Sequence, residues 1–343
     1  MRIGVLTGGG DCAGLNAVIR AVVKRAEEYG WEVIGIKYGW KGLVEKEPIT
    51  QKLTFKDVEN IHKLGGTILK TSRTNPFKNE EDKKRLLDNI KKLKIDALIA
   101  IGGDDTLGVA EKLHKLGINV VGVPKTMDND VSETDFTFGF DSAVNEAMHA
   151  LDNLLTTGQS HERVMIAEVM GRNAGWVAAY SGIAAGAHLI LVPEEPFDIE
   201  EVVKFVKKRN EKGEKATLIV VAEGATLKNA SAFAKEGKVD EFGHPKLGGI
   251  AQFLAEEIEK RTGFEVRSVV LGHTIRGGEP SAFDRVLSTR FGIEAVELVK
   301  QKKFGYMVAL HSTKIEAVPL EKAVSKMKNL NEEFLTTIKK VSY

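Results

Sequence analysis

The chain has 343 residues, a formal net charge of +1 and 28% charged residues, so it is long enough for two domains that each bury a core. The near balance of charge gives no electrostatic footprint for nucleic acid or an anionic membrane, so basic groups that bind a ligand must be clustered locally. A single cysteine, Cys12, excludes an internal disulfide framework and is typical of a reducing compartment. The N-terminus has no secretory signal, and no uncharged run is long enough to cross a bilayer. We therefore expect a cytoplasmic protein without nucleic-acid or membrane partners.

The first predicted unit is a strand, a glycine loop and a helix. Residues 2–7 form a short apolar strand, and apolar residues recur at helical spacing over 15–29. Glycines let backbone N–H groups approach an anion, and the helix N-terminus adds the positive end of its dipole. The Gly-x-Gly-x-x-Ala pattern at 8–13 resembles a dinucleotide fingerprint, but the second strand ends in Lys37 and offers no carboxylate for a ribose. The loop therefore indicates phosphate binding, with a merely tight turn as the alternative.

The strand and helix rhythm continues to residue 123. Residues 41–60 are expected to form a linker with a short strand and helix, and 65–73 a glycine-led strand that ends at Arg73. Arg73 is a candidate phosphate contact, although a lone arginine on a loop is more often only solvated. Such a rhythm predicts a largely parallel sheet with right-handed crossovers. The remaining elements predicted here are helices at 80–93 and 107–116 and strands at 95–101, 32–36 and 120–123.

Two carboxylates, Asp104 and Asp105, follow the buried strand at 95–101 and a pair of glycines. Carboxylates in this position suit a hard cation such as Mg²⁺ that bridges phosphate oxygens. Adjacent residues leave a strand in opposite directions, so the two carboxylates are expected to have different roles.

The run from Val121 to Asp130 is an apolar strand that ends at a proline and then presents Lys125, Asp128 and Asp130. In an open parallel sheet, ligands bind beyond the carboxyl ends of the strands, on loops whose geometry the sheet fixes. The alternative is a solvated turn behind a proline that ends the strand. The short motif by itself does not decide between the two.

The second half repeats the alternation and predicts a second domain. The strand at 164–169 delivers Arg172 at a glycine turn, and the strand near 266–271 is surrounded by Arg267, His273 and Arg276. Residues 226–250 are polar and glycine-rich, which suggests an exposed excursion. The other predicted elements are helices at 143–155, 176–186, 200–212, 250–262, 284–300 and from 320 onward, and strands at 189–192, 217–222 and 306–310.

Other chemistries find little support. A lone His273 is more often a structural histidine than a ligand. His161 and Glu162 do not continue into a zinc-binding spacing, and Cys12 beside an acidic residue is not an obvious thiolate nucleophile.

Five motifs, taken together, resemble the phosphofructokinase family, in this order and over nearly the whole chain. They are GGGDCAGLN at 8–16, GGDDT at 102–106, PKTMDND at 124–130, MGRNAG at 170–175 and LGHTIRGG at 271–278. The resemblance implies an α/β fold of two doubly wound, mainly parallel sheets with flanking helices and an active site in the cleft between two domains. The domains would be 1–139 with about 275–325, and 140–274 with about 326–343.

The resemblance also implies a role for individual residues. Asp128 would take the proton from the 1-hydroxyl of fructose 6-phosphate, and Asp104 would position Mg²⁺. Thr126 and Arg172 would hold the phosphoryl group during transfer, with Lys125 beside them, as positioning and charge neutralisation require. The implied donor-binding residues are Gly10, Arg73, Asp105 and Thr106.

The sugar-phosphate site implied by the resemblance draws on two subunits, so a homo-oligomer, dimer or tetramer, is expected. One subunit would supply Thr126, Asp128, Asp130, Met170, Gly171, Arg172, Glu223, Arg276 and, against the 6-phosphate, His273. The neighbouring subunit would supply Arg163 and Arg267.

One departure within the family bears on the phosphoryl donor. ATP-using members typically have glycine where this chain has Asp105 and Lys125, whereas pyrophosphate-using members have Asp and Lys. A carboxylate at 105 would repel an α-phosphate, and an ammonium at 125 can neutralise the terminal charge of pyrophosphate. The sequence therefore predicts a reversible pyrophosphate-dependent 6-phosphofructokinase.

Several alternatives remain at this stage. An ATP-dependent enzyme and a catalytically silent sugar-phosphate sensor are both compatible with the fold, and GGDDT alone would also suit NAD and lipid kinases. An effector site is poorly supported. Arg20, Lys24, Lys212 and Lys215 are basic where allosteric members carry basic groups, but they can equally form a solvated face, and no arginine lies near Thr156. We expect weak or absent control by nucleotides.

Overall fold

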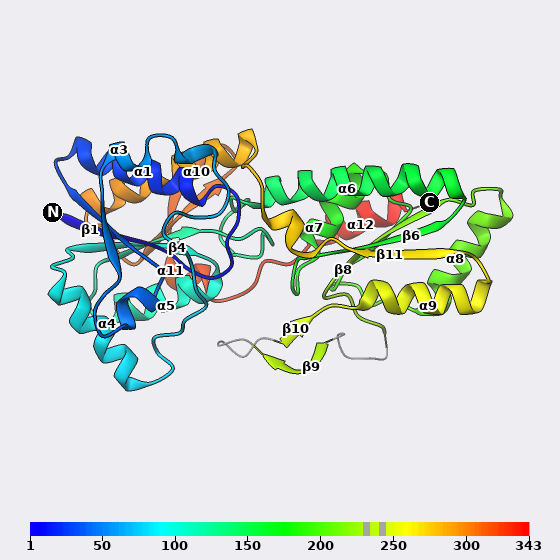
Figure 1. The fold of residues 1–343 in the computed structure, drawn as a ribbon, viewed down its shortest axis with the longest axis horizontal. Coiled ribbons are helices and arrows are strands. Elements are labelled where there is room, and N and C mark those ends of the chain that lie inside the picture. Colours follow the sequence, from blue (N-terminus) through cyan, green and yellow to red (C-terminus); the bar gives the residue numbers. More distant parts are fainter. Residues whose placement is uncertain (229–233, 240–244, 343) are drawn as a thin grey trace.

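Two sheets, one in each of two lobes that lie side by side along the long axis of the molecule, organise the chain (Figure 1). The computed structural model describes residues 1–228, 234–239 and 245–342. The sheet of the first lobe has the strand order β13-β12-β5-β4-β1-β2-β3, and that of the second lobe has the order β11-β6-β8-β7. The predicted fold class, α/β with two mainly parallel sheets and flanking helices, is confirmed.

The first sheet is parallel in its interior and antiparallel at both edges. Strands β2, β1, β4, β5 and β12 run parallel, whereas β3 and β13 pair antiparallel with β2 and β12. Strands β4 and β5 are buried along their whole length, as expected for parallel strands covered on both faces. The strands are β1 (Arg2–Thr7), β2 (Glu32–Ile36), β3 (Thr50–Leu53), β4 (Ala97–Gly102), β5 (Val120–Pro124), β12 (Tyr306–His311) and β13 (Lys314–Pro319).

Helices cover both faces of this sheet. In α1 the apolar residues at helical spacing, from Leu15 to Ala26, are buried against the sheet and α10. Helix α5 begins at Asp104, earlier than predicted, so both aspartates of GGDDT lie in its first turn. The elements are α1 (Leu15–Glu28), α2 (Lys41–Val44), α3 (Phe55–Val58), η1 (Ile61–Lys63), α4 (Glu80–Lys92), α5 (Asp104–Lys115), α10 (Ala282–Lys300) and α11 (Leu320–Ala323).

The strand predicted at 65–73 is wrong, because this segment is an irregular loop. Gly66 and Lys70 both have left-handed backbone, with φ of 63° and 60°, which an extended strand does not allow. The buried side chain of Asn16 makes the backbone hydrogen bonds that a neighbouring strand would otherwise make. Its Nδ2 donates to the backbone oxygens of Leu64 and Gly65 at 3.1 and 3.2 Å, and its Oδ1 accepts from the N–H of Ile68 at 2.9 Å.

The four strands of the second sheet all run parallel. Helix α6 is longer than the predicted 143–155 and lies along the top of this lobe in Figure 1. The elements are α6 (Phe140–His161), β6 (Val164–Val169), α7 (Trp176–Ala184), β7 (Leu189–Leu191), α8 (Ile199–Glu211), β8 (Thr217–Ala222), α9 (Ile250–Thr262), β11 (Val266–Val270), η2 (Gly272–Arg276) and α12 (Glu332–Val341).

Part of the predicted exposed excursion at 226–250, namely residues 229–233 and 240–244, lies outside the described residues. Within the excursion, β9 (Ala234–Val239) and β10 (Pro245–Leu247) form an antiparallel pair. The tail was predicted as one helix from 320, and this is wrong, since α11 and α12 are separate. Residues 324–331 between them pass from the first lobe to the second (Figure 1). The predicted domain limits stay a prediction.

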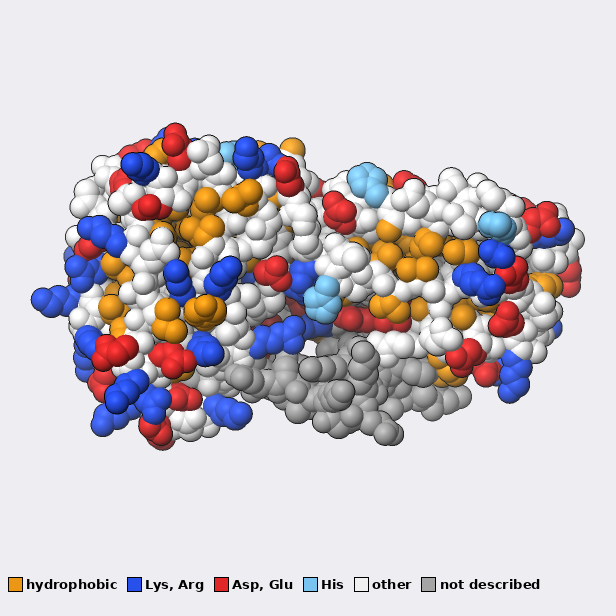
Figure 2. Space-filling view, in the orientation of Figure 1, with side chains coloured by type: hydrophobic (Ala, Val, Ile, Leu, Met, Phe, Trp, Pro, Cys, Tyr) orange, Lys and Arg blue, Asp and Glu red, His pale blue; other side chains and the backbone are white. Residues whose placement is uncertain are grey.

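The topology fixes where a ligand can bind. In the first sheet β1 lies between β2 and β4, so the loops that follow β1 and β4 diverge at a switch point. In the second sheet β6 and β8 are neighbours, and the chain continues from β6 to β7 on one side and from β8 to β11 on the other, so a switch point lies between them as well. Charged side chains of both signs gather where the two lobes meet (Figure 2). Among the helices that the structure describes, none is long and apolar enough to cross a membrane.

Candidate functional site

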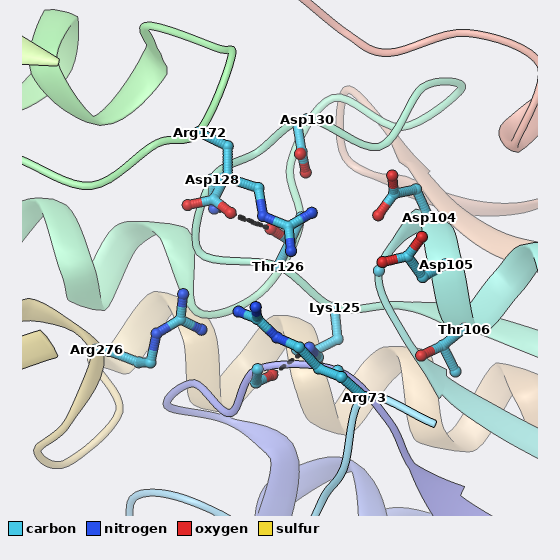
Figure 3. Close-up of a pocket in the computed structure, with 13 residues that line it drawn as sticks. Arg73, Asp104, Asp105, Thr106, Lys125, Thr126, Asp128, Asp130, Arg172 and Arg276 are labelled. Carbon is cyan, nitrogen blue, oxygen red and sulfur yellow. Dashed lines mark hydrogen bonds between the residues drawn. The ribbon is translucent and has the colours of Figure 1, made fainter. Parts of the chain in front are cut away.

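A pocket lies at the carboxyl ends of β1, β4 and β5, and loops of the second lobe complete it (Figure 3). It unites all of the predicted catalytic, donor-binding and metal residues. Each of the five motifs contributes at least one lining residue, and Arg73 comes from outside them. The lining residues are Gly9, Gly10, Arg73, Gly103, Asp104, Asp105, Thr106, Lys125, Thr126, Asp128, Asp130, Arg172 and Arg276.

The glycine loop after β1 is held against the loops of neighbouring strands. The N–H of Gly9, whose φ is 79°, donates to the oxygen of Ser72 at 3.0 Å, and Thr71 Oγ1 donates to the oxygen of Gly9 at 2.6 Å. A Cβ at Gly10 would lie 2.5 Å from Nη1 of Arg276, so a side chain there would collide with a cation of the pocket. Glycine therefore keeps backbone and arginine close together at this wall.

Lys125 continues β5 and turns its ammonium toward the glycine loop. Its backbone N–H donates to the oxygen of Gly102 at 2.9 Å, and its Nζ donates to the oxygen of Gly10. The residue is only 4% exposed. Burial lowers the pKa of Lys125, and the nearby Arg276 lowers it further. The amino group of Lys125 is thus fixed on the floor of the pocket, beside the backbone that would receive donor phosphates.

Asp128 is a buried carboxylate on the wall of the pocket. Its backbone N–H donates to Thr126 Oγ1 at 3.0 Å, and its Oδ2 lies 3.4 Å from the same hydroxyl. Among the described residues, no donor hydrogen-bonds to its Oδ1, although the residue is 6% exposed. A buried acceptor without a donor is rare in folded proteins and indicates a functional position.

Asp130 and Asp104 add negative charge to the same wall. Burial raises the pKa of Asp130 above the ordinary range, and the carboxylates of Asp128 and Asp104 raise it further. Asp104 is exposed and Asp105 half-buried, both in the first turn of α5, where the helix dipole favours negative charge.

The residues fit a divalent cation that is shared with a phosphate. Within the described ranges, no group of three or more His, Cys, Asp or Glu side chains forms a metal cage. Mg²⁺ does not require one, because it usually takes one or two carboxylates together with phosphate oxygens and water. Asp104, on the pocket wall and exposed, suits that arrangement.

Two arginines enter from the second lobe (Figure 3). Arg172 follows β6 with a left-handed φ of 50°. The carboxylate of Glu223, after β8, accepts from the N–H groups of Gly171 and Arg172 at 3.3 and 3.0 Å. Arg276 ends η2, and its Nη1 donates to the oxygen of Asp11 at 2.6 Å. Each arginine is therefore oriented by backbone contacts at the junction of the lobes.

Six predicted site residues do not line this pocket. Met170 and Gly171 directly precede Arg172. Glu223 accepts hydrogen bonds from the backbone N–H groups of Gly171 and Arg172. His273 is exposed in η2. Arg163 and Arg267 lie at the amino ends of β6 and β11 and both pair with Glu265, at 2.7 and 2.5 Å.

The residues considered for an effector site do not meet within one chain. Arg20 and Lys24 of α1 lie over the ring of Phe55, and Lys215 pairs with Glu162 at 2.6 Å. Helices α1 and α8 occupy opposite ends of the molecule (Figure 1). The expectation of weak nucleotide control stays a prediction.

Sequence reasoning missed residues of two kinds. Gly9 and Gly103 lie within two of the motifs but were not predicted as site residues. Treating every glycine of these loops as a candidate phosphate contact would have included them. Lys328 contacts the loop that carries Asp128 from almost 200 residues away, and no motif signals it.

The arrangement suits the movement of a phosphoryl group. Cations and carboxylates face one another across a pocket with glycine backbone at one side. A buried carboxylate oxygen to which no described residue donates lies beside a hydroxyl and an arginine. Phosphoryl transfer requires positioning, charge neutralisation and a base near the acceptor, and these residues can supply all three.

Comparison with known proteins gives the same family over the length of the chain. The family model described as Phosphofructokinase matches residues 2–299. A pyrophosphate–fructose 6-phosphate 1-phosphotransferase of Amycolatopsis methanolica is 54% identical over 97% of both chains. ATP-dependent 6-phosphofructokinase 3 of Streptomyces coelicolor is 51% identical over 96% of both chains.

A solved structure agrees with these sequence relationships. Pichia pastoris phosphofructokinase in the T-state superposes on 99% of this chain with a TM-score of 0.83 and 30% identity, and this chain spans 36% of that one. With motifs, pocket and fold in agreement, the chain belongs to the phosphofructokinase family.

Proposed function

We propose that this protein is a pyrophosphate-dependent 6-phosphofructokinase, which transfers a phosphoryl group reversibly from pyrophosphate to the 1-hydroxyl of fructose 6-phosphate. The observation that carries the proposal is the buried Oδ1 of Asp128, which no described donor contacts, in a pocket that also holds Lys125 and Arg172. A protein that only binds a sugar phosphate needs no base at the acceptor hydroxyl.

In the forward reaction, Asp128 accepts the proton of the sugar 1-hydroxyl as that oxygen attacks the terminal phosphorus of pyrophosphate. The bond from this phosphorus to the bridging oxygen breaks, and inorganic phosphate leaves with the electron pair. Thr126 and Arg172 stabilise the charge on the phosphoryl group in transit. The products are fructose 1,6-bisphosphate and phosphate.

Mg²⁺ is the proposed cation. When bound, it would bridge donor phosphate oxygens and reduce their charge. Asp104 would hold it. The pKa of Asp130 is raised by burial and then by the charges of Asp128 and Asp104, and this negative field favours a cation there.

Asp105 and Lys125 are proposed to select the donor. Both line the pocket that the glycine loop borders, so a carboxylate and an ammonium flank the position for donor phosphates. The carboxylate repels the α-phosphate of a nucleotide, and the ammonium neutralises the terminal charge of pyrophosphate. Overall identity does not separate the donors, because relatives with names of both kinds match at 54% and 51%. The two side chains therefore carry this part of the proposal.

We further propose a cytoplasmic homo-oligomer, dimer or tetramer, in which fructose 6-phosphate is bound by two subunits. Met170, Gly171, Glu223, Arg276 and His273 of one subunit would face Arg163 and Arg267 of its neighbour. The last two side chains lie at the opposite end of their strands from the pocket, which supports contact with a site other than that of their own chain.

A coupled assay with pyrophosphate, ATP and polyphosphate as donors tests the proposal. We expect fructose 1,6-bisphosphate to form with pyrophosphate and Mg²⁺, and phosphate to drive the reverse reaction. Turnover with ATP and none with pyrophosphate would favour the ATP-dependent alternative. Binding of fructose 6-phosphate without turnover on any donor would favour a sensor.

A further inference from the structure

Residues 324–331, here called the crossover segment, connect α11 in the first lobe to α12 in the second (Figure 1). Met327 forms an isolated antiparallel bridge with Val131, which directly follows Asp130. The N–H of Leu330 donates to Glu194 Oε1 at 3.0 Å. The crossover segment therefore contacts the loop of the proposed base on one side and a residue of the second lobe on the other.

Glu194 connects this segment to the loop that carries Arg172. Its two carboxylate oxygens accept from the N–H of Gly175 at 3.0 and 3.1 Å, and Gly175 ends the Gly171–Gly175 turn before α7. The crossover segment thus lies between two loops that contribute Asp128 and Arg172 to one pocket.

The ammonium of Lys328 has a complete set of acceptors. Its Nζ donates to Asn129 Oδ1 at 2.8 Å and to the backbone oxygens of Thr134 and Asp135 at 2.9 Å each. A lysine ammonium has three N–H donors and no acceptor, so these contacts satisfy it fully. Hydrogen bonds from a charged donor are stronger than neutral ones, and all three end on the loop that begins with Asp128.

The backbone of Lys328 fixes the same junction. Its N–H donates to the oxygen of Asp130 at 2.8 Å, and its oxygen accepts from Nε1 of Trp176 at 2.9 Å. The ammonium also lies 5.5 Å from the centre of the Trp176 ring, within the range of a cation–π contact. Trp176 is the first residue of α7, directly after the turn of Arg172.

Asn129 transmits the contact to Asp128. Its backbone is left-handed, with φ of 53°, and its Oδ1 accepts from both Lys328 and the N–H of Thr137, the latter at 3.1 Å. Thr137 Oγ1 in turn donates to the oxygen of Thr126 at 2.7 Å. The residues before and after Asp128 are thereby joined through one carboxamide that Lys328 holds.

We propose that Lys328 is a positioning residue of the phosphoryl-transfer site. It holds the 128–135 loop against the turn of Arg172, so that Asp128 and Arg172 contact the same substrates during transfer. This inference rests on the proposed function. Lys328 does not line the pocket, so its removal disturbs geometry and leaves the substrate contacts in place. A displacement of about 1 Å in such a site lowers the rate on the order of 100-fold.

The first test compares Lys328→Met, Lys328→Gln and Lys328→Arg with Lys326→Met, an exposed lysine two residues away in the same segment. We expect Lys328→Met to lower kcat at least 10-fold, with the KM for fructose 6-phosphate within about threefold of wild type. Lys328→Arg, which keeps the charge, should retain more activity than Lys328→Gln, and Lys326→Met should match wild type. An unchanged kcat in Lys328→Met or Lys328→Gln overturns the proposal. If Lys328→Met does not fold, Lys328→Gln and Lys328→Arg decide.

A second readout does not depend on turnover. Hydrogen exchange of peptides from 126–137 should be faster in Lys328→Gln than in wild type, whereas peptides from α4 should not change. Equal exchange in the loop overturns the proposal even if activity falls. If wild type shows no turnover with any donor, the proposed function fails, and the exchange result still decides whether Lys328 orders the loop.

Discussion

Lys125 donates a hydrogen bond from its Nζ to the backbone oxygen of Gly10, 115 residues earlier in the chain. The proposed donor selector is therefore attached to the loop proposed to receive the donor. Asp105 lines the same pocket from the first turn of α5. The two side chains act on one ligand from two strand ends, so their effects are expected to be coupled.

Replacing both residues, Asp105→Gly with Lys125→Gly, should admit ATP. The double variant removes a repelling carboxylate and a bulky buried ammonium, and we expect kcat/KM with ATP to rise at least 10-fold while kcat/KM with pyrophosphate falls by a similar factor. Each single variant should show much less gain with ATP, because neighbouring residues that share a ligand are not additive. Steady-state kinetics of wild type, both single variants and the double variant, each with both donors, give the double-mutant cycle.

Lys46→Gly, at an exposed turn residue, is the matched control and should behave as wild type with both donors. Melting temperatures show whether each variant is folded. ATP exclusion that persists in a folded double variant would contradict the selection mechanism.

Asp128→Asn should nearly abolish turnover. The amide cannot accept the proton of the sugar hydroxyl, so kcat should fall between about 100-fold and 10,000-fold. The dissociation constant for fructose 6-phosphate, measured by calorimetry, should change little, because the shape of the side chain is kept. Asp88→Asn on the exposed face of α4 is the control. Retention of more than a tenth of the wild-type kcat in Asp128→Asn would assign the base to another residue.

The sequence predicted the parts of the site that are local. Gly10, Asp104 and Lys125 each follow a buried strand of the first sheet, and parallel strands bring their carboxyl ends to one edge, so motif and strand pattern together placed these three residues in one pocket. Arg172 follows a strand of the second sheet, and only the family resemblance, with its site between two domains, implied that it faces them. The edge strand β13 and the irregular loop at 65–73 were not predicted. Their backbone is decided by partners far away in the chain, such as Asn16 for the loop.

Lys328 is the clearest example of a residue whose role could not be predicted from the sequence. Nothing in its neighbourhood distinguishes it from Lys322 or Lys326, which are exposed. Its role depends on where the crossover segment passes between the lobes, and this is set by the packing of α12 on α7, where Phe334 stacks on Tyr180 with ring centres 5.1 Å apart. Tertiary packing of this kind has no short-range signature.

Asp284→Asn should stabilise the protein at alkaline pH and leave it unchanged at acid pH. Asp284 is fully buried at the start of α10, and its Oδ2 accepts from the N–H and Oγ of Ser142 at 2.8 and 2.5 Å. Burial raises the pKa of Asp284 from its ordinary value of 3.8 to about 6, against the opposing effect of the Ser142 hydrogen bonds. Folding therefore favours the protonated acid.

The stability that this acid contributes is fully present below about pH 4 and is lost as pH rises through about 6, because the unfolded chain then holds fewer protons than the folded one. A rise of this size corresponds to on the order of 3 kcal/mol. Asparagine stays neutral and still accepts from Ser142. Urea unfolding of both proteins at pH 4.5 and pH 8 measures the difference. Other carboxylates with a raised pKa, such as Asp130, affect both proteins alike. If wild type and Asp284→Asn lose the same free energy of unfolding between pH 4.5 and pH 8, Asp284 does not titrate as argued.

Mixtures of inactive subunits should regain activity if neighbouring chains share sites. Arg163 precedes β6 and Arg172 follows it, so six residues of strand, about 20 Å, separate Arg163 from the pocket of its own chain. Arg163→Ala and Asp128→Asn should each be nearly inactive. In an equimolar mixture of dissociated and reassembled chains, half of random dimers are mixed, and each mixed dimer has one site with both residues intact. About a quarter of the wild-type activity is expected from such pairing.

The control is a mixture of Asp128→Asn with Thr126→Val. Both residues line the pocket from one chain, so no mixed dimer contains an intact site, and no activity should return. Size-exclusion chromatography with light scattering must show that reassembly has occurred. If Arg163→Ala and Asp128→Asn chains reassemble without recovery, Arg163 does not act across the interface. Its ion pair with Glu265 at 2.7 Å is then a contact within one subunit, and the basic groups for the 6-phosphate must be sought among Arg276 and His273 of the same chain.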